Sequence, residues 1–249
     1  PKASIPIRPS SHVADKKFGF FQEQQNDFFE VAGNLGTLKN NNKILRHPLA
    51  YLVEAADDIC YTLIDFEDGI NLGWISEDYA LEYLINLVRD RIDSKKYKTL
   101  STKKDRLSYL RALSINTLIL EVSEIFMNNE LEILSGKFKD SLIKKSKYTA
   151  QMEDIINLSI LKIYQAPEVI DKELKGYQVI NRLLDVFVGA TIRNSKNLAT
   201  AFDNLSLSCL PKNLINYDSD NTYKILLNVS SFIASLTDGK ALEWFKKMS

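Results

Sequence analysis

The sequence predicts an all-α protein. Its 249 residues include only 9 glycines and 6 prolines, so it has room for long helices and few turn signals for hairpins. Apolar side chains recur every three or four residues over long stretches, and no stretch sustains an alternation of period two. No internal repeat of the length found in solenoid proteins is visible. We therefore expect a multi-helix fold with at most one small β-hairpin.

The first third of the chain predicts a connector and two helices. Residues 1–15 contain three prolines and should be an extended connector. After a short apolar cluster at residues 16–21, residues 22–36 have the apolar side of a helix. The next helix should cover residues 47–69, because Pro48 fits the first turn and no breaker follows it.

The middle of the chain predicts a helix, a loop and further helices. Ser76 can cap a helix over residues 76–92. A lysine-rich stretch at residues 94–106 follows, and its lysines could bind phosphate, although a solvated loop is the simpler interpretation. Residues 107–127 should form a long apolar helix, and residues 129–147 one or two short helices.

The last third is also predicted to be helical. Residues 149–166 should form a helix that Pro167 stops. Residues 168–176 fit either an extended piece or a short helix. Apolar periodicity predicts three further helices, at residues 176–192, 221–236 and 239–248, the last one capped by Thr237 or Asp238. No clean internal domain boundary is visible, so we treat residues 16–249 as one helical region.

Composition limits the classes of function. Lysine and arginine total 32, aspartate and glutamate also total 32, and the resulting zero net charge argues against a dedicated nucleic-acid binder. No run of 18 apolar residues is present, so we expect no membrane-spanning helix. The two cysteines, Cys60 and Cys209, are too few for a disulfide framework and suit a reducing compartment. We therefore expect a cytoplasmic protein.

The helix predicted over residues 47–69 has an unusual density of carboxylates. Because four residues turn an α-helix by about 400°, Asp57, Tyr61 and Asp65 project from one face. Such a row can serve a metal ion, an aromatic platform and a hydroxyl acceptor. From spacing alone, a solvated acidic face is the commoner interpretation. Against it, both aspartates lie beside apolar residues, near the edge of the expected buried stripe, where a carboxylate needs a partner.

Several other kinds of site are excluded. The sequence has no glycine-rich phosphate loop, no serine nucleophile elbow and no Cys-x-x-Cys pair. It has only two histidines, so a site that needs several imidazoles cannot be complete. We interpret His47 as a helix-start residue and His12 as part of the connector. The residues alone indicate one candidate face for metal and hydroxyl binding, and they name no substrate.

Residues 46–69, RHPLAYLVEAADDICYTLIDFEDG, resemble the deoxyguanosine triphosphate triphosphohydrolase-like enzymes, which are HD-domain phosphohydrolases. The run E-A-A-D-D-I-x-Y-x-x-x-D-x-E-D is close to a signature of that group. Three weaker blocks keep the family's order: K-K-F-G at 16–19, G-Y-Q-V-I at 176–180 and I-A-S-L-T-D-G-K-A-L at 233–242. The resemblance covers nearly the whole chain and implies the C-terminal portion of an HD-domain-like helical bundle.

The resemblance also implies an activity and a set of site residues. Family members cut a deoxynucleoside triphosphate into the deoxynucleoside and inorganic triphosphate, with Mn or Mg, and commonly form homo-oligomers such as hexamers. By position, Asp57 matches the last metal ligand, and five residues match substrate contacts. These are Tyr61 on the sugar, Asp65 at the 3′-hydroxyl, Lys17 at the triphosphate, and Glu173 and Tyr164 near the base.

One departure from the family pattern is serious. The family holds its metal with a His, a His-Asp pair and a final Asp, and this chain has no His-Asp dipeptide. Of that ligand set only Asp57 is present. We therefore expect a C-terminal fragment, inactive alone, whose partner is the missing N-terminal half of the same protein. The alternatives are a non-catalytic oligomerisation module, a regulatory module that binds nucleotide or single-stranded DNA, and an HD phosphohydrolase of another nucleotide.

Overall fold

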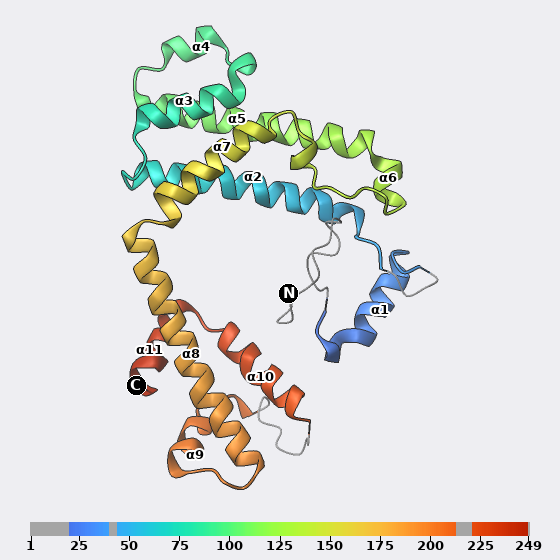
Figure 1. Cartoon of the computed structure of the whole chain (residues 1–249), viewed down its shortest axis with the longest axis vertical. Helices are drawn as coiled ribbons and strands as arrows, with labels where there is room; N and C mark the ends of the chain where they lie inside the picture. The colour runs from blue at the N-terminus through green and yellow to red at the C-terminus, as the bar shows by residue number, and fades with distance from the viewer. Residues whose placement is uncertain (1–19, 40–43, 213–220, 249) are drawn as a thin grey trace. The chain divides into compact units, whose positions relative to one another are not determined.

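The computed structural model describes residues 20–39, 44–212 and 221–248, and these are helical almost throughout (Figure 1). They form eleven α-helices, α1 to α11, and the prediction of an all-α fold is confirmed. No β-strand occurs in these three ranges, and in place of the allowed hairpin there is a single antiparallel bridge between Leu38 and Ile44. The connector expected at residues 1–15 lies outside the described residues. Across the same ranges, no helix combines the length and apolarity that crossing a membrane requires.

The chain divides into two compact units, residues 1–166 and 167–249. We expected one helical region from residue 16 to 249, because the apolar periodicity does not mark this division. Pro167 signals only the end of one helix and the start of another. Each unit has its own cluster of buried hydrophobic side chains.

The first unit is a bundle around α2. Four helices pack on one another (Figure 1): α2 (Pro48–Asn71), α3 (Glu77–Val88), α5 (Lys103–Asn128) and α7 (Thr149–Ser159). The shorter helices of this unit are α1 (Gln25–Asn34), α4 (Ser94–Thr99) and α6 (Glu130–Leu134). Phe66, Leu110, Leu118 and Met152 are almost fully buried in the core. Each such side chain stabilises the fold by about 1.5–3 kcal/mol, so the core holds α2 in place.

The lysine-rich stretch at residues 94–106 is not a loop, contrary to our expectation. The Asp93 carboxylate accepts hydrogen bonds from the backbone N–H groups of Lys95 and Lys96, at 2.9 and 3.2 Å, and starts α4. The Thr102 hydroxyl oxygen accepts from the N–H of Asp105 at 3.0 Å and starts α5, which therefore begins before residue 107. Both helix starts depend on side-chain caps that the apolar pattern does not reveal.

The second unit is organised by the long helix α8. Its helices are α8 (Pro167–Ser195), α9 (Ala201–Ser208), α10 (Thr222–Ala234) and α11 (Asp238–Met248), and the last three each pack against α8. Residues 168–176, which the sequence left undecided, are helical. Gly176 lies in the interior of α8 and not at a helix start, because nothing interrupts the helix there. Thr237, one of the two residues predicted to cap the last helix, caps α11.

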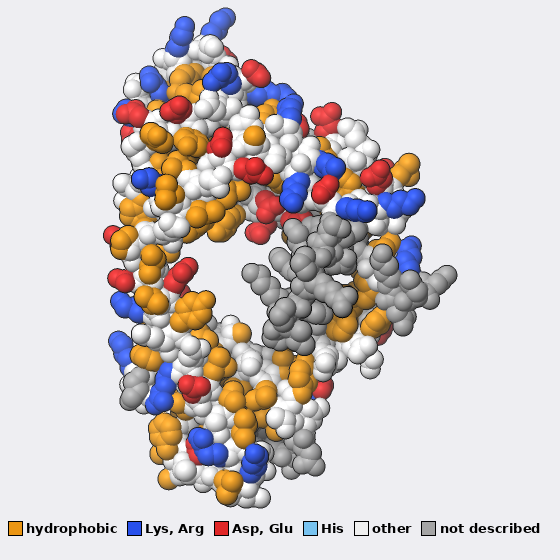
Figure 2. Space-filling view, in the orientation of Figure 1, with side chains coloured by type: hydrophobic (Ala, Val, Ile, Leu, Met, Phe, Trp, Pro, Cys, Tyr) orange, Lys and Arg blue, Asp and Glu red, His pale blue; other side chains and the backbone are white. Residues whose placement is uncertain are grey.

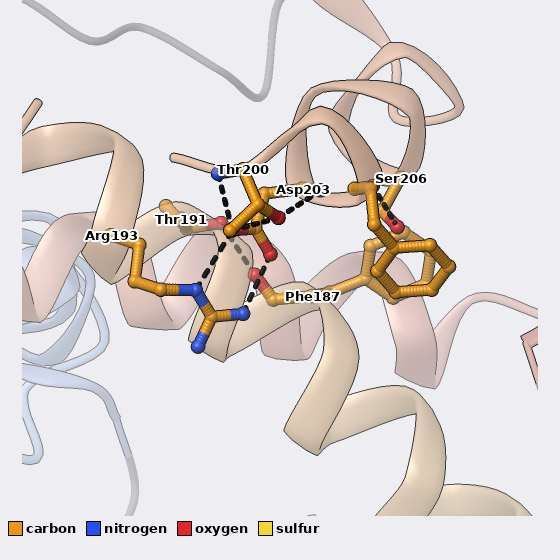
Figure 3. Close-up of polar contacts among 7 residues, drawn as sticks. Phe187, Thr191, Arg193, Thr200, Asp203 and Ser206 are labelled. Carbon is orange, nitrogen blue, oxygen red and sulfur yellow. Dashed lines mark hydrogen bonds and ion pairs between the residues drawn. The ribbon is translucent and has the colours of Figure 1, made fainter. Parts of the chain in front are cut away.

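An ion pair between the exposed Arg193 and the buried Asp203 fixes α9, a helix that the sequence did not predict, against α8. Arg193 donates to both carboxylate oxygens of Asp203, at 2.8 and 2.6 Å (Figure 3). Asp203 also accepts from the backbone N–H of Thr200 at 2.8 Å, and the Thr200 hydroxyl accepts from the Asp203 N–H, which completes a capping box. The bond from Arg193, with that from Thr200, holds the pKa of Asp203 well below its usual range.

Candidate functional site

The candidate site is built on α2, and two local features start this helix. His47 Nδ1 accepts a hydrogen bond from the backbone N–H of Leu49 at 3.2 Å, and Pro48 fills the first position, where its missing N–H is not needed. One turn further, the buried hydroxyl of Tyr51 donates to the carbonyl of Phe138 at 2.9 Å. These contacts anchor the start of α2, and His47 has the helix-start role expected of it.

The three residues expected to share a face of α2 lie on successive turns of one helix. Asp57 is exposed, Tyr61 is 54% exposed, and Asp65 is half-buried. The expectation that Asp57 lies at the edge of a buried stripe is wrong, because its neighbour Ala56 is itself exposed. Asp57 is not buried, so its carboxylate does not require a charged or hydrogen-bonding partner. Its role depends on what binds to this face of α2.

Three of the expected site residues contact one another. The Tyr164 hydroxyl donates to Asp65 Oδ2 at 2.7 Å, and the Tyr164 ring stacks on that of Tyr61, with centroids 5.6 Å apart and planes 24° apart. Burial raises the pKa of Tyr164 above its ordinary value, and its interactions with Tyr61 and Asp65 add to the rise. The phenol therefore keeps its proton and remains a donor at neutral pH. We call these three residues the Asp65 cluster.

A π-helix brings Tyr164 to the Asp65 cluster. Residues Ile160–Tyr164 form this π-helix directly after α7. The Ile163 side chain lies against Gly69 of α2, where an added Cβ would stand only 2.5 Å from Ile163 Cδ1. Glycine at residue 69 thus permits the close approach of the two segments. Short π-helices are frequent at functional sites, which makes this segment a reasonable place for a ligand contact.

The described residues do not by themselves assemble a metal site. They contain no group of three or more His, Cys, Asp or Glu side chains that could hold an ion. A divalent cation needs several oxygen or nitrogen ligands, and Asp57 offers a single carboxylate. Asp57 would therefore be one ligand among several, and the others would have to come from outside these residues.

Two predicted contacts remain, Lys17 and Glu173. Lys17 lies outside the described residues. Glu173 is an exposed side chain of α8, in the second unit. Their assignment to the triphosphate and the base stays a prediction.

Sequence reasoning missed two ion pairs and a cavity beside α2. Arg46 donates to Glu54 at 2.8 Å, and Arg111 of α5 pairs with Glu67. A cavity of about 480 Å³ lies between α2, α3 and α5, and charged side chains such as Arg111 and Lys104 share its lining with apolar ones. No residue of the Asp65 cluster lines it. Arg111 and Glu67, like the residues that line the cavity, come from segments far apart in the chain, and Arg46 and Glu54 are eight residues apart. No local sequence pattern could therefore have indicated these contacts.

The family resemblance predicts an all-α fold and an acidic helix that presents an aspartate, a tyrosine and a second aspartate on successive turns. The structure has both features. A scan of the chain against models of known protein families finds no match. Comparison with curated proteins, in contrast, finds relatives over the full length of the chain.

The relatives carry closely similar names. A deoxyguanosinetriphosphate triphosphohydrolase-like protein of Synechocystis sp. is 31% identical over 251 residues, which are 100% of this chain and 55% of that protein. One of Listeria monocytogenes is 28% identical over 272 residues, 100% of this chain and 57% of the relative. A deoxyguanosinetriphosphate triphosphohydrolase of Yersinia pestis is 28% identical over 200 residues, 74% of this chain and 39% of the relative.

The chain belongs to the deoxyguanosinetriphosphate triphosphohydrolase-like family. It spans about half the length of the curated relatives that it matches over its full length.

Proposed function

We propose that this chain contributes the sugar-binding side of a metal-dependent deoxynucleoside triphosphate triphosphohydrolase site. The substrate would be of the deoxyguanosine triphosphate type, and the products the deoxynucleoside and inorganic triphosphate. Asp57 would supply one ligand to a Mn or Mg ion, which polarises the α-phosphate when it is bound. Because the remaining ligands are not among the described residues, we expect the 249-residue chain to be inactive alone.

The Asp65 cluster is the observation that carries this proposal. Asp65 accepts a hydroxyl at 2.7 Å, a short bond typical of an O–H donor to a carboxylate. A carboxylate has about four lone-pair sites, so Asp65 can accept a sugar 3′-hydroxyl while it stays bonded to Tyr164. The exposed part of the Tyr61 ring offers an apolar surface to the deoxyribose. The 2′-hydroxyl of a ribonucleotide would lie against this surface without a hydrogen-bond partner.

The other contacts complete the proposal. Lys17 would neutralise part of the triphosphate charge, and Glu173 and Tyr164 would lie near the base. The relatives' printed names support a substrate of the deoxyguanosine type. We further propose a cytoplasmic homo-oligomer, with a hexamer as the expected form.

The test concerns the 3′-hydroxyl. Express the longest open reading frame that contains these residues, and measure kcat/KM for deoxyguanosine triphosphate and its 3′-deoxy analogue with Mn. The 3′-deoxy analogue leaves the remaining acceptor sites of the Asp65 carboxylate without a hydroxyl donor, so we expect a large preference for the natural substrate, which Asp65→Asn should reduce by about tenfold or more. The ratio needs no correction for the amount of folded enzyme. An unchanged ratio would contradict the role of Asp65.

A panel of the four deoxynucleoside triphosphates and their four ribonucleotide counterparts, assayed on the same protein, addresses base preference and nucleotide class. A clear preference for a different nucleotide class would favour the alternative of another HD phosphohydrolase. Turnover restricted to deoxynucleoside triphosphates would support the present assignment.

A non-catalytic assembly module is the second candidate. Large apolar side chains are well exposed on several helices: Leu131 is 83% exposed, Tyr177 70% and Leu205 68%. Such side chains suit contacts between subunits. The coding sequence upstream of Pro1 distinguishes the candidates, because a His followed by a His-Asp pair favours the enzyme and an immediate start codon favours the module. Binding of single-stranded DNA by the 249-residue chain would give the module a regulatory ligand.

A further inference from the structure

The cavity between α2, α3 and α5 has an apolar floor. Its volume of about 480 Å³ lies within the range of small-molecule sites, about 300–1,000 Å³. Leu63 and Phe66 of α2 and Leu84 of α3 line it, and all three side chains are almost fully buried. At about 100° per residue, Leu63 and Phe66 project away from the side of α2 that carries Asp57. The cavity therefore lies behind that side of the helix, and its floor suits an apolar group.

Hydrogen-bonding side chains complete the lining. Three of them come from α5, where Lys104, Ser108 and Arg111 are spaced by four and three residues and so share one face of the helix. Glu77, in the first turn of α3, and Glu67 of α2 add carboxylates, and Glu67 is bonded to Arg111. The cavity thus offers hydrogen-bond donors from α5 and a carboxylate acceptor from α3.

Two of the charged lining residues, Lys104 and Glu77, are available to a ligand. Among the described residues, neither one has an ion pair or a side-chain hydrogen bond. Lys103, on which the charge of Glu77 also acts, is bonded to Asp78 at 2.8 Å. This bond joins the start of α5 to the start of α3. It therefore keeps the two helix ends that carry Lys104 and Glu77 next to each other.

The charge of the lining limits the class of ligand. Two basic and two acidic side chains line the cavity, so the lining has no net charge. In Figure 2, blue, red and orange side chains are interspersed in the upper part of the view, where Figure 1 shows α3, α4 and α5. A simple anion would suit Lys104 and be repelled by Glu77, and a simple cation would meet the reverse. A small zwitterion with an apolar group suits both charges and the floor.

We propose that this cavity binds a free α-amino acid with an apolar side chain. The ligand's carboxylate would accept hydrogen bonds from Lys104 and Ser108, and its ammonium group would donate to Glu77. Its apolar side chain would lie on Leu63 and Phe66 and leave water. Both charged groups of such a ligand are attached to one carbon atom, which matches charges on neighbouring helix ends. The inference concerns binding alone and does not depend on the proposed function.

A titration of the 249-residue chain at neutral pH tests the ligand class. Isothermal titration calorimetry measures the dissociation constants of leucine, methionine and phenylalanine. Analogues of the tightest ligand then lack its ammonium group, its carboxylate or its side chain, and for leucine these are isocaproate, isoamylamine and glycine. We expect each analogue to bind about tenfold more weakly or worse, because each leaves one part of the lining without a counterpart.

Matched variants test the assignment of the two charged contacts. Lys104→Met and Glu77→Gln remove one charge each at positions that line the cavity. Lys98→Met in α4 and Glu82→Gln in α3 remove the same charges at exposed positions outside the lining. Circular dichroism checks that all four variants fold. We expect each lining variant to weaken binding of the amino acid by about fivefold or more, and each control to bind like the wild-type chain.

Three results would overturn the proposal. The first is an absence of binding by all three amino acids. The second is an analogue with a single charge that binds as tightly as the amino acid. The third is binding by Lys104→Met and Glu77→Gln that equals binding by their controls. Since the titration needs no turnover, its outcome is independent of the hydrolysis assays that test the proposed function.

Discussion

At the residue scale, Asp65 and Tyr164 form a contact that joins positions 99 residues apart. The phenol donates and the carboxylate accepts, and Tyr61, on the preceding turn of α2, stacks on the phenol ring. The bond fixes the orientation of the Asp65 carboxylate. Without this hydrogen bond the side chain would not keep a single orientation. A substrate hydroxyl would then meet an acceptor that is already oriented.

Tyr164→Phe should weaken this arrangement without removing the ring. We expect the free energy of unfolding to fall by about 1 kcal/mol at pH 7, the usual contribution of one such hydrogen bond. Urea unfolding followed by circular dichroism measures it. Tyr148→Phe, at a partly buried tyrosine outside the Asp65 cluster, serves as the control. Equal stability of the Tyr164→Phe variant and the wild-type chain would show that the bond contributes nothing.

The raised pKa of Tyr164 predicts how this difference depends on pH. Its folded pKa lies above the unfolded value of about 10, so its stabilisation is complete below pH 10 and is lost as the pH rises further. Above pH 10 the unfolded chain releases this proton while the folded chain keeps it. The stability difference between wild type and Tyr164→Phe should therefore narrow from pH 9 to pH 11. A difference that grows over this interval would contradict the assigned shift.

Part of the candidate site was predictable at this scale. The helical period alone places Asp57, Tyr61 and Asp65 on one side of α2. The bond between Asp65 and Tyr164 was not predictable from the residues, because it depends on tertiary packing across 99 residues. The burial expected for Asp57 was wrong because apolar spacing shows that a face is apolar, and not whether anything covers it.

At the element scale, the π-helix and α2 meet at Gly69. A Cβ at this position would lie 2.5 Å from Ile163 Cδ1 and 3.2 Å from Ile75 Cδ1, and both isoleucines are buried. The next residue after Ile163 is Tyr164, so any displacement here reaches the Asp65 cluster. Gly69 therefore links the packing of these elements to the geometry of the candidate site.

Gly69→Ala should destabilise the chain, although alanine is the better helix former. Overpacking costs about 1–3 kcal/mol, which exceeds the helix-propensity gain of about 1 kcal/mol. Gly176→Ala in α8 is the matched control, because nothing lies within 4 Å of its added Cβ, and it should be stabilising. Urea unfolding of both variants measures whether each substitution raises or lowers the free energy of unfolding. Stabilisation by Gly69→Ala would contradict this expectation, because it would mean that the Ile163 side chain moves aside without loss of stability.

The helices themselves show where sequence reasoning succeeds. Long amphipathic helices such as α2, α3 and α5 were predicted because the apolar period repeats over several turns. The short helices α4 and α9 were not, since they are fixed by the caps at Asp93 and Thr200. Gly176 suggested a break in α8 that the structure does not have, because a single exposed glycine only weakens a helix.

At the scale of the whole molecule, the chain is two compact helical units with separate cores. The candidate site residues of α2 and the π-helix lie in the first unit, and Glu173 lies in the second. Asp57 is one exposed carboxylate of α2, beside exposed apolar side chains of the same helix.

The central claim is that Asp57 ligates the catalytic metal of a triphosphohydrolase, and triphosphate release from deoxyguanosine triphosphate with Mn tests it. The assay compares the product of the longest reading frame with its Asp57→Ala variant. Asp68→Ala, which removes another exposed carboxylate of α2, is the control. We predict that Asp57→Ala lowers turnover by about 100-fold or more, since even groups that only orient metal ligands contribute about 10–100-fold, while Asp68→Ala stays near wild type. Turnover by Asp57→Ala equal to the wild type, or enzyme-like release by the 249-residue chain alone, would contradict the account.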